Sequence, residues 1–271
     1  MISLQRNKKG ELVNAPGKRS RKTSIYNPGQ NSDFKISRGK FQDFLSCKKC
    51  FYLDRVTGLK SPDTPPYTLN SATDTLYKKE FDICRIKQEP HRLLVKYNLN
   101  HIVPFNHPDI DMWRDALHYG LMCRYRNTNM ILSGGIDDVW YNTQNQKLVI
   151  ADYKSQVKKK EKLNVRDYLS DVYHQGYKNQ LEFYSFLLMN MGFQVDKTGY
   201  FVVCNVNINE EGFNQVMKFD ELLVPYELNS SWIPDKIEEM ISILNNSDIP
   251  QSHPSCMNCA YDNQRREHVS E

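Results

Sequence analysis

The stretch that decides the fold is Lys147-Leu148-Val149-Ile150-Ala151-Asp152-Tyr153-Lys154. Side chains two residues apart on a strand point the same way, so Asp152 and Lys154 project together from the end of this segment. Leu148 and Ile150 share the face of Asp152, and the residues between them give an equally apolar opposite face. A strand that is apolar on both faces is usually central in its sheet and covered on both sides.

The segment before this strand supplies a partner strand and a second acid. Residues 130–141 favour a β-strand, and the polar run 142–145 is typical of a hairpin turn. On the partner strand, Asp137 lies across the hairpin at about the level of Asp152. Asp138 faces the other way and is the second choice, after Asp137, for the acid that pairs with Asp152.

Two carboxylates and an ammonium at one sheet edge suit metal-assisted hydrolysis of a phosphodiester. Carboxylate oxygens hold Mg²⁺ or Mn²⁺, and such a metal polarises the phosphate and lowers the pKa of an attacking water. Lys154 can orient that water or stabilise the negative charge that develops on the phosphorane. From Asp152 and Lys154 alone, however, a surface ion pair at a strand end is the simpler interpretation.

The remaining periodicity predicts a mixed α/β domain. Helices are expected over residues 38–55 after the N-cap Ser37, and over 68–86, 113–124, 167–191 and 234–244, with strands over 200–207 and 216–223 and a loop over 90–110. Residues 1–33 are rich in Gly, Pro, Asn and basic side chains and have no apolar period, which predicts a disordered basic tail. The domain is expected to span residues 34–271.

The motifs around the two acids closely resemble the PD-(D/E)XK nuclease superfamily, in the order Gly135-Ile136-Asp137, hairpin, Asp152-Tyr153-Lys154. Downstream, Gln180 and Tyr184 share one helix face and look like the Q-x-x-x-Y motif of the RecB-like branch, in which these groups contact the substrate or the catalytic lysine. The resemblance implies a restriction-endonuclease-like core, a mixed central β-sheet flanked by helices. An amphipathic helix with Tyr184 in the core is the alternative interpretation.

The resemblance also implies roles for residues in a Mg²⁺- or Mn²⁺-dependent DNA nuclease. The implied catalytic residues are Asp137, Asp152, Lys154, Gln180 and Tyr184, and the implied metal ligands are Asp137, Asp152 and the backbone carbonyl of Tyr153. The branch carries a histidine on an early helix, within a run similar to residues 72–81, where this chain has Asp74. Asp74 is either a further metal ligand, since its carboxylate also suits a hard cation, or an exposed helix residue.

Four of the seven cysteines form two C-x-x-C pairs, Cys47/Cys50 and Cys256/Cys259, at opposite ends of the predicted domain. Four thiolates can enclose Zn²⁺ or hold an iron–sulfur cluster, and four independent free cysteines are the alternative. The layout resembles iron–sulfur nucleases related to AddB and to the CRISPR-associated exonucleases, which implies a [4Fe–4S] cluster that joins the N- and C-terminal segments. Those nucleases have a further cysteine where this chain has Arg265. Zn²⁺ is therefore the alternative to the iron–sulfur cluster at this site.

Basic and aromatic residues suggest where a nucleic acid would lie. The net charge is +4, but residues 1–33 hold seven basic and two acidic side chains, so the body of the chain is close to neutral. A run after the central strand either tracks the phosphate backbone or is a solvated loop, and it contains Lys158, Lys159, Lys160 and Lys162. Tyr173 and Tyr177 either stack on bases or pack inside.

These patterns lead to two hypotheses about function. The first is a DNA nuclease, expected to be an exonuclease on single strands or duplex ends in repair, recombination or defence. Because the sequence has no helicase motif, unwinding would require a helicase or another DNA-processing partner. The second is a catalytically inactive nuclease-fold protein that binds nucleic acid or supports an assembly. The chain has no apolar run of about 18 residues and no secretory signal, so we expect no membrane partner and a cytoplasmic location.

Overall fold

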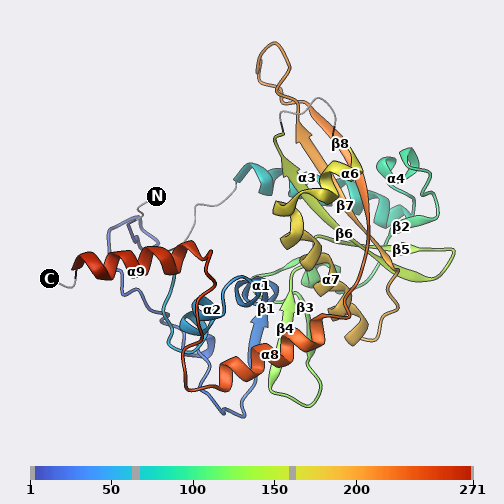
Figure 1. Ribbon diagram of the computed structural model, residues 1–271. Helices are drawn as coiled ribbons and strands as arrows, with labels where there is room; N and C mark the ends of the chain where they lie inside the picture. Colours follow the sequence, from blue (N-terminus) through green and yellow to red (C-terminus); the bar gives the residue numbers. More distant parts are fainter. Residues whose placement is uncertain (1–3, 63–67, 159–162, 270–271) are drawn as a thin grey trace. The chain divides into compact units, whose positions relative to one another are not determined.

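The computed structural model describes residues 4–62, 68–158 and 163–269 (Figure 1). The chain divides into two compact units, each of which is described by itself. Unit 1 consists of Met1–Pro66, Arg124–Ile131 and Trp232–Glu271, and unit 2 consists of Tyr67–Cys123 and Leu132–Ser231.

Unit 2 is built on a five-stranded sheet in the order β2-β5-β6-β7-β8. The strands are β2 Ile102–Pro104, β5 Asp138–Asn142, β6 Lys147–Gln156, β7 Thr198–Val206 and β8 Phe219–Glu227. β6 and β7 are parallel, and the other neighbours are antiparallel. This is the mixed central sheet that the sequence predicts.

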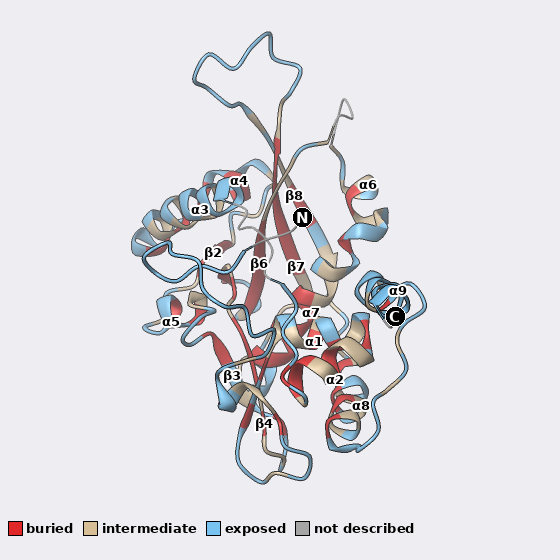
Figure 2. Cartoon of the chain, turned by 90° about the vertical axis from the view of Figure 1, so that its left-hand side faces the viewer, coloured by how far each residue is buried: buried red, intermediate tan, exposed pale blue. Residues whose placement is uncertain are grey.

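The central position predicted for residues 147–154 is confirmed, because β6 is the middle strand. Its residues 148–153 are all buried, and buried positions run along the middle of the sheet in Figure 2. A four-residue turn joins β5 to β6 after the pair Asn142↔Lys147. The Asn142 side chain accepts hydrogen bonds from the backbone N–H groups of Gln144 and Asn145 (3.0 and 3.4 Å), a local arrangement that favours a turn.

Helices cover both faces of this sheet. Helix α3 (Thr68–Lys87) and the short α4 (Arg92–Lys96) pack on one face, where Phe81 and Leu93 join a core with Ala151 and Tyr153. Helix α7 (Gln175–Asn190) lies on the other face, which carries Asp152, and its residues 180–188 are all buried. The connection from β6 to β7 also contains α6 (Val165–Ser170) and a 3₁₀ turn, Val172–His174.

Unit 1 is mainly helical. Its helices are α1 Arg38–Ser46, α2 Lys48–Arg55, α8 Ile233–Asn245 and α9 Met257–Val269, with a 3₁₀ turn at Lys22–Ser24. The chain also has a second sheet, in the order β1-β4-β3, which consists of β1 Phe34–Ser37, β4 Met130–Gly134 and β3 Leu121–Arg124. The division between the units falls within β3 and β4, so this sheet belongs to neither unit alone. Ser37 caps α1 as predicted, because its hydroxyl accepts a hydrogen bond from the N–H of Lys40 (3.3 Å).

Two helices that the periodicity predicts as continuous are interrupted. The helix over 38–55 breaks at Cys47, whose backbone is extended (φ −157°) and which begins α2. The helix over 167–191 breaks at Asp171, whose carboxylate accepts a hydrogen bond from the N–H of Tyr173 (3.0 Å) and so starts a new turn. Apolar periodicity continues across each break, which is why the sequence alone does not reveal it.

The prediction of a helix over 113–124 is wrong. Helix α5 ends at Arg114 (Ile110–Arg114), and the chain then turns into β3. The Asp115 carboxylate accepts hydrogen bonds from the N–H groups of Leu117 and His118 (3.0 and 3.1 Å) and stabilises the turn. Gly120 follows at φ +81°, where a Cβ would lie 2.8 Å from the carbonyl oxygen of Gly134, so only glycine fits. The predicted loop over 90–110 also contains α4, β2 and the start of α5.

Part of the segment predicted to be disordered is packed in unit 1. Tyr26 is buried, lies edge-on to Phe34 and donates a hydrogen bond to the side chain of Asn245 (2.9 Å). Arg19 forms an ion pair with Asp54 (2.5 Å). An aromatic anchor and a charge pair therefore order this region despite its polar composition. The domain boundary at residue 34 stays a prediction.

A buried charge network fastens helices to the sheet of unit 2. Asp138 is fully buried, and its Oδ1 accepts hydrogen bonds from Arg85 of α3 and Arg114 of α5. The Tyr153 hydroxyl of β6 donates to Oδ2 (2.7 Å). Burial acts to raise the pKa of Asp138, but the two guanidinium groups outweigh it and hold the pKa below its usual value. The second-choice metal ligand is therefore a structural carboxylate.

We predict that Asp138→Asn lowers the free energy of unfolding by about 3–5 kcal/mol, because the neutral amide no longer balances the positive charges of the two guanidinium groups. Urea denaturation at neutral pH measures the loss. Since the folded-state pKa is depressed, the wild-type contribution is present above the unfolded-state pKa and is lost as the pH falls through the folded-state pKa. The difference in stability between the two proteins should therefore shrink in strong acid.

Asp33→Asn, at the exposed Arg124 pair, serves as the control and should leave stability unchanged. Equal stability of Asp138→Asn and wild type would contradict the prediction.

Candidate active site and cysteine site

The centre of the candidate active site is Asp152, near the end of β6. Its side chain is fully buried, and its Oδ1 accepts a hydrogen bond from the Gln180 amide (2.8 Å). Its Oδ2 forms an ion pair with the Lys154 ammonium and has no further donor among the described residues. A buried carboxylate oxygen short of donors is energetically costly, so this atom has capacity for a further positive partner.

Asp137 lies beside Asp152, as the hairpin predicts, although it precedes β5 and is not part of the strand. Its Oδ2 accepts a hydrogen bond from the backbone N–H of Tyr153 (3.0 Å), and its side chain is within hydrogen-bonding reach of Asp152. The structure therefore brings together the two acids that the sequence pairs.

The charges at this site are strongly coupled. Burial raises the pKa of Asp152 to about 7, and the Asp137 carboxylate adds to the rise while Lys154 opposes it. Burial acts to lower the pKa of Lys154, but Asp152 and Asp137 outweigh it and raise that pKa above its usual value. Two carboxylates and a charged lysine share a space from which water is largely excluded, and a divalent cation would relieve the repulsion between the acids.

Gln180 and Tyr184 connect helix α7 to this site. The Gln180 amide donates to Asp152 and also to the Tyr184 hydroxyl (3.1 Å). The Tyr184 hydroxyl in turn donates to the carbonyl oxygen of Gly135 (2.5 Å), two residues before Asp137. The pair thus links the strand that carries one acid to the loop that carries the other, and Tyr184 does more than fill the core.

Lys154 rests on an aromatic stack that the sequence did not reveal. Its Nζ lies 4.7 Å from the ring centroid of Tyr177, which stacks on His174 at 5.3 Å. His174 lies 4.1 Å from the buried ring of Tyr168. One face of Tyr177 therefore contacts the lysine, whereas Tyr173 is 87% exposed.

Asp74 lies at the edge of the site. It is half-buried on α3 and forms an ion pair with Lys78 (2.8 Å). Burial raises its pKa, and the Asp137 carboxylate contributes to the rise, which places the two acids near each other. In the described part of the chain, however, the only group of three or more His, Cys, Asp or Glu side chains with ligand atoms all within 4.8 Å is the four cysteines. The role of Asp74 as a metal ligand stays a prediction.

The donor chemistry at Asp137 and Asp152 fits a hard divalent cation. Both side chains offer oxygen atoms, which Mg²⁺ and Mn²⁺ prefer, and the Oδ2 atom of Asp152 has unused acceptor capacity. The backbone carbonyl of Tyr153 stays a predicted third ligand.

Of the predicted DNA-contacting lysines, only Lys158 is among the described residues; Lys159, Lys160 and Lys162 lie outside them. The Lys158 ammonium forms an ion pair with Asp171, and its backbone N–H donates to the Asn205 side chain (2.8 Å). Lys158 therefore connects the segment just after β6 to Asp171 and Asn205, and it also carries a positive charge.

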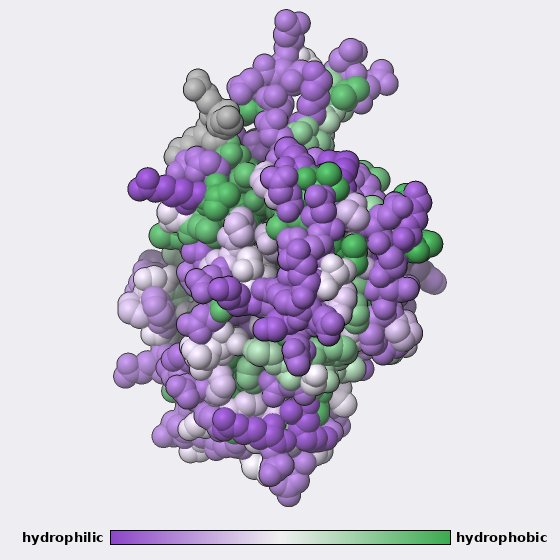
Figure 3. Space-filling model, turned by 90° about the vertical axis from the view of Figure 1, so that its right-hand side faces the viewer, coloured by the Kyte–Doolittle hydropathy of each residue, from purple (hydrophilic) through white to green (hydrophobic). Residues whose placement is uncertain are grey.

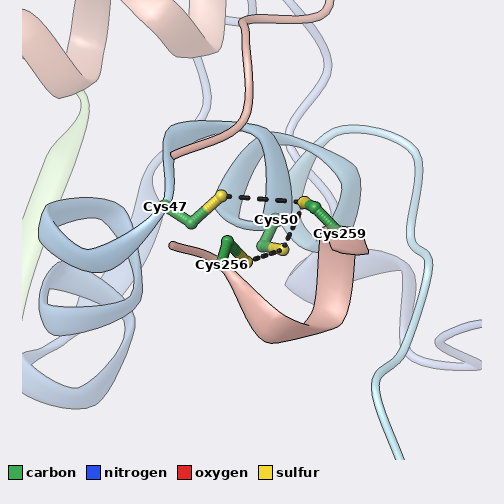
Figure 4. A group of neighbouring side chains, drawn as sticks. All are labelled: Cys47, Cys50, Cys256 and Cys259. Atoms are coloured by element: carbon green, nitrogen blue, oxygen red, sulfur yellow. Dashed lines mark hydrogen bonds between the residues drawn. The ribbon is translucent and has the colours of Figure 1, made fainter. Parts of the chain in front are cut away.

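The four cysteines meet in unit 1, as predicted (Figure 4). The sulfur of Cys50 lies 3.5 Å from that of Cys256 and 3.4 Å from that of Cys259, and the sulfur atoms of Cys47 and Cys259 are 3.9 Å apart. Cys47 and Cys259 are buried, and the other two are partly buried. The site joins segments more than 200 residues apart in the sequence.

The surroundings of Cys47 favour a thiolate. Burial acts to raise the pKa of its thiol, but hydrogen bonds from the backbone N–H groups of Cys50 and His253 help to lower that pKa to about 7. Cys47 also begins helix α2, where the N-terminal dipole favours negative charge. Burial and the neighbouring sulfur atoms raise the pKa of Cys50.

Residues that hold the site together were harder to predict than those inside it. Arg85 and Arg114 belong to no motif, and Tyr177 was considered for base stacking or packing but not as a contact of Lys154. Arg85 follows the buried Phe81 by four residues and so falls on the buried face of α3, a position where a charge requires a partner. That signal could have indicated Arg85, but the partner Asp138 is 53 residues away.

A comparison with protein-family models identifies the family of this chain. The family model for the PD-(D/E)XK nuclease superfamily matches residues 86–264, more than half of the chain. The match includes both acids, Lys154 and the C-terminal cysteine pair. No curated protein matches the sequence.

No helix in the described ranges is long and apolar enough to cross a membrane. The face drawn in Figure 3 is mainly hydrophilic, and its apolar residues form small separate groups.

We predict that Tyr184→Phe lowers the free energy of unfolding by about 1–3 kcal/mol, because it leaves buried polar partners of the hydroxyl unsatisfied. Chemical denaturation measures the change. Tyr173→Phe removes the same atom from an exposed side chain and should be neutral. If Tyr184→Phe is equally neutral, Tyr184 is a core residue whose hydroxyl contributes nothing.

Proposed function

We propose that this chain, which belongs to the PD-(D/E)XK nuclease superfamily, hydrolyses DNA phosphodiester bonds with the help of Mg²⁺ or Mn²⁺. Membership of the superfamily indicates a nuclease; the DNA substrate and the metal are our inference. The observation that carries the proposal is the convergence of Asp137, Asp152 and Lys154 at one end of β6, where the Oδ2 atom of the buried Asp152 has an ion pair with Lys154 and no further donor among the described residues.

Each residue of the site has a role in this proposal. Asp137, Asp152 and the Tyr153 carbonyl would hold the cation, with Asp74 as a further ligand. The bound cation would polarise the phosphate and lower the pKa of a water molecule. Lys154 orients that water and offsets negative charge that develops on the phosphate.

Gln180 and Tyr184 act mainly by holding the two acids in place. Gln180 fixes one oxygen of Asp152, which leaves the other oxygen directed toward Lys154 and the cation. Tyr184 holds the loop before Asp137 through Gly135. The same pair resembles the Q-x-x-x-Y motif, which supports placement in the RecB-like branch and a contact with the DNA strand.

The lysine-rich run supports a DNA path beside the site. Lys158 lies two residues after the end of β6, and Lys159, Lys160 and Lys162 continue the run in the sequence. Cationic side chains along a strand bind phosphates without regard to sequence. We propose exonuclease action on single strands or duplex ends in the cytoplasm, in repair, recombination or defence, with a helicase or other DNA-processing partner.

A second candidate is a nuclease-fold protein that binds nucleic acid or supports an assembly without cleaving. Asp74 in place of the histidine of the early-helix motif favours this candidate, because it changes the donor chemistry beside Asp137.

We predict that Lys154→Met and Asp152→Asn each lower Mn²⁺-dependent DNA cleavage by about 100-fold or more, because Lys154→Met removes the positive charge that offsets charge on the phosphate and Asp152→Asn removes a carboxylate that would hold the cation. Labelled single-stranded DNA, duplex DNA and RNA of one sequence are incubated with each protein and the products resolved. Lys218→Met, at an exposed pair with Glu210, should cleave as wild type does. Full activity of Lys154→Met with an intact fold would contradict the proposed site. Binding without cleavage by the wild type in either metal would favour the second candidate, and cleavage of RNA alone would overturn the assignment of DNA.

We predict that Tyr177 positions Lys154 through the face of its ring. Tyr177→Leu should lower kcat roughly 2- to 30-fold, the effect of losing a cation–π contact, with KM nearly unchanged. Tyr177→Phe keeps the ring and should keep most of kcat. Loss of binding in Tyr177→Leu with unchanged kcat would instead indicate that the ring stacks on bases.

A further inference from the structure

We propose that the four-cysteine site holds one tetrahedrally coordinated zinc ion and not the [4Fe–4S] cluster implied by the resemblance to iron–sulfur nucleases. The proposal rests on the spacing of four sulfur atoms and on the way in which two helices present them. It does not depend on the nuclease activity, because every ligand lies in unit 1 and every proposed catalytic residue lies in unit 2.

The spacing of the sulfur atoms fits a single ion. Zinc–thiolate bonds are about 2.3 Å long, so the sulfur atoms of a tetrahedral site lie about 3.8 Å apart. The three separations given above are 3.4, 3.5 and 3.9 Å. All four sulfur atoms lie within 4.8 Å of one another, so one central ion can reach every one of them.

The same spacing does not fit a cubane. In a [4Fe–4S] cluster each cysteine binds a different iron, and the four thiolates point outward from the corners of a body of eight atoms. A regular tetrahedron with edges of 4.8 Å has its corners only about 2.9 Å from its centre, which is room for one metal ion. A cluster would require these side chains to move apart.

Two matching half-sites present the cysteines. The carbonyl of Cys47 accepts the N–H of Phe51 (3.0 Å), and the carbonyl of Cys256 accepts the N–H of Ala260 (2.9 Å), each four residues later. The first cysteine of each pair therefore begins a helix, and the second lies three residues on, in its first turn. Since residues three apart lie on one helix face, each helix start offers two sulfur atoms to the same point.

This two-plus-two arrangement differs from the one-plus-three pattern of the iron–sulfur nucleases. In place of their last cysteine stands Arg265, which is exposed on α9. The fourth ligand comes from Cys50 at the first helix. Both halves then consist of two thiolates at a helix N-terminus, which suits the equal bond lengths around a zinc ion.

A zinc ion here would act as a structural cross-link. It connects the starts of α2 and α9, which belong to chain segments separated by the whole of unit 2. Because metal binding contributes directly to folding free energy, unit 1 should lose stability when the ion is removed.

The test is the metal content of the full chain, purified anaerobically from cells supplied with both iron and zinc. We expect one zinc per chain, negligible iron and sulfide, and a colourless protein. Replacement of zinc by Co²⁺ should give the intense visible bands of tetrahedral cobalt–thiolate coordination, and a zinc chelator should lower the melting temperature.

Variants keep the proposal falsifiable. Cys256→Ser should lower the zinc content of purified protein, whereas Cys123→Ser changes a cysteine outside the cluster and should keep one zinc per chain. Lys154→Met should also keep its zinc, which separates this site from the proposed nuclease. If Cys256→Ser does not fold, the metal content and cobalt spectrum of the wild type decide alone. A brown protein with about four irons and four sulfides per chain, or a wild type that binds no metal, would overturn the proposal.

Discussion

Two carboxylates buried on neighbouring strands set the constraint that the rest of unit 2 satisfies. Asp138 and Asp152 are both fully buried, and a buried charge is tolerated only when it is paired and hydrogen-bonded. Asp138 is supplied in full by Arg85, Arg114 and Tyr153. Asp152 has only Gln180 at one oxygen and Lys154 at the other among the described residues. The saturated acid is structural, and the unsaturated acid marks the candidate active site.

The two buried acids need partners from different helices, which explains why helices from distant parts of the sequence lie around one end of β6. Helix α3 reaches the sheet through Arg85, and helix α7 reaches it through Gln180 on the opposite face. Each helix therefore satisfies one of the two acids while it covers apolar residues of the sheet. Unit 1 brings four cysteines together, where burial and the neighbouring sulfur atoms raise the pKa of Cys50.

An apolar run on both faces was sufficient to predict that β6 is a central strand, and the polar run 142–145 was sufficient to predict its hairpin with β5. The hairpin in turn placed Asp137 beside Asp152. Helix ends were predicted less well, because Asp171 and Cys47 interrupt helices without interrupting the apolar period. The turn from Asp115 to Gly120 was missed for a similar reason, since a carboxylate and a close approach to Gly134 decide it. Tyr26 was assigned to a disordered tail because that prediction used only the composition of residues 1–33. The contacts that order Tyr26 are with Phe34 and Asn245, which lie outside this segment.

The sequence by itself determined which groups lie together locally: an acid and a lysine on the central strand, an acid just before its partner strand, a glutamine and a tyrosine on one helix face, and two cysteine pairs. Those features are local, because spacing along a strand or helix fixes which side chains point together. Only the tertiary structure decided which acid is structural, that Tyr177 supports Lys154, and how closely the sulfur atoms approach. These outcomes depend on burial and on distances between segments up to about 200 residues apart, which local spacing does not encode.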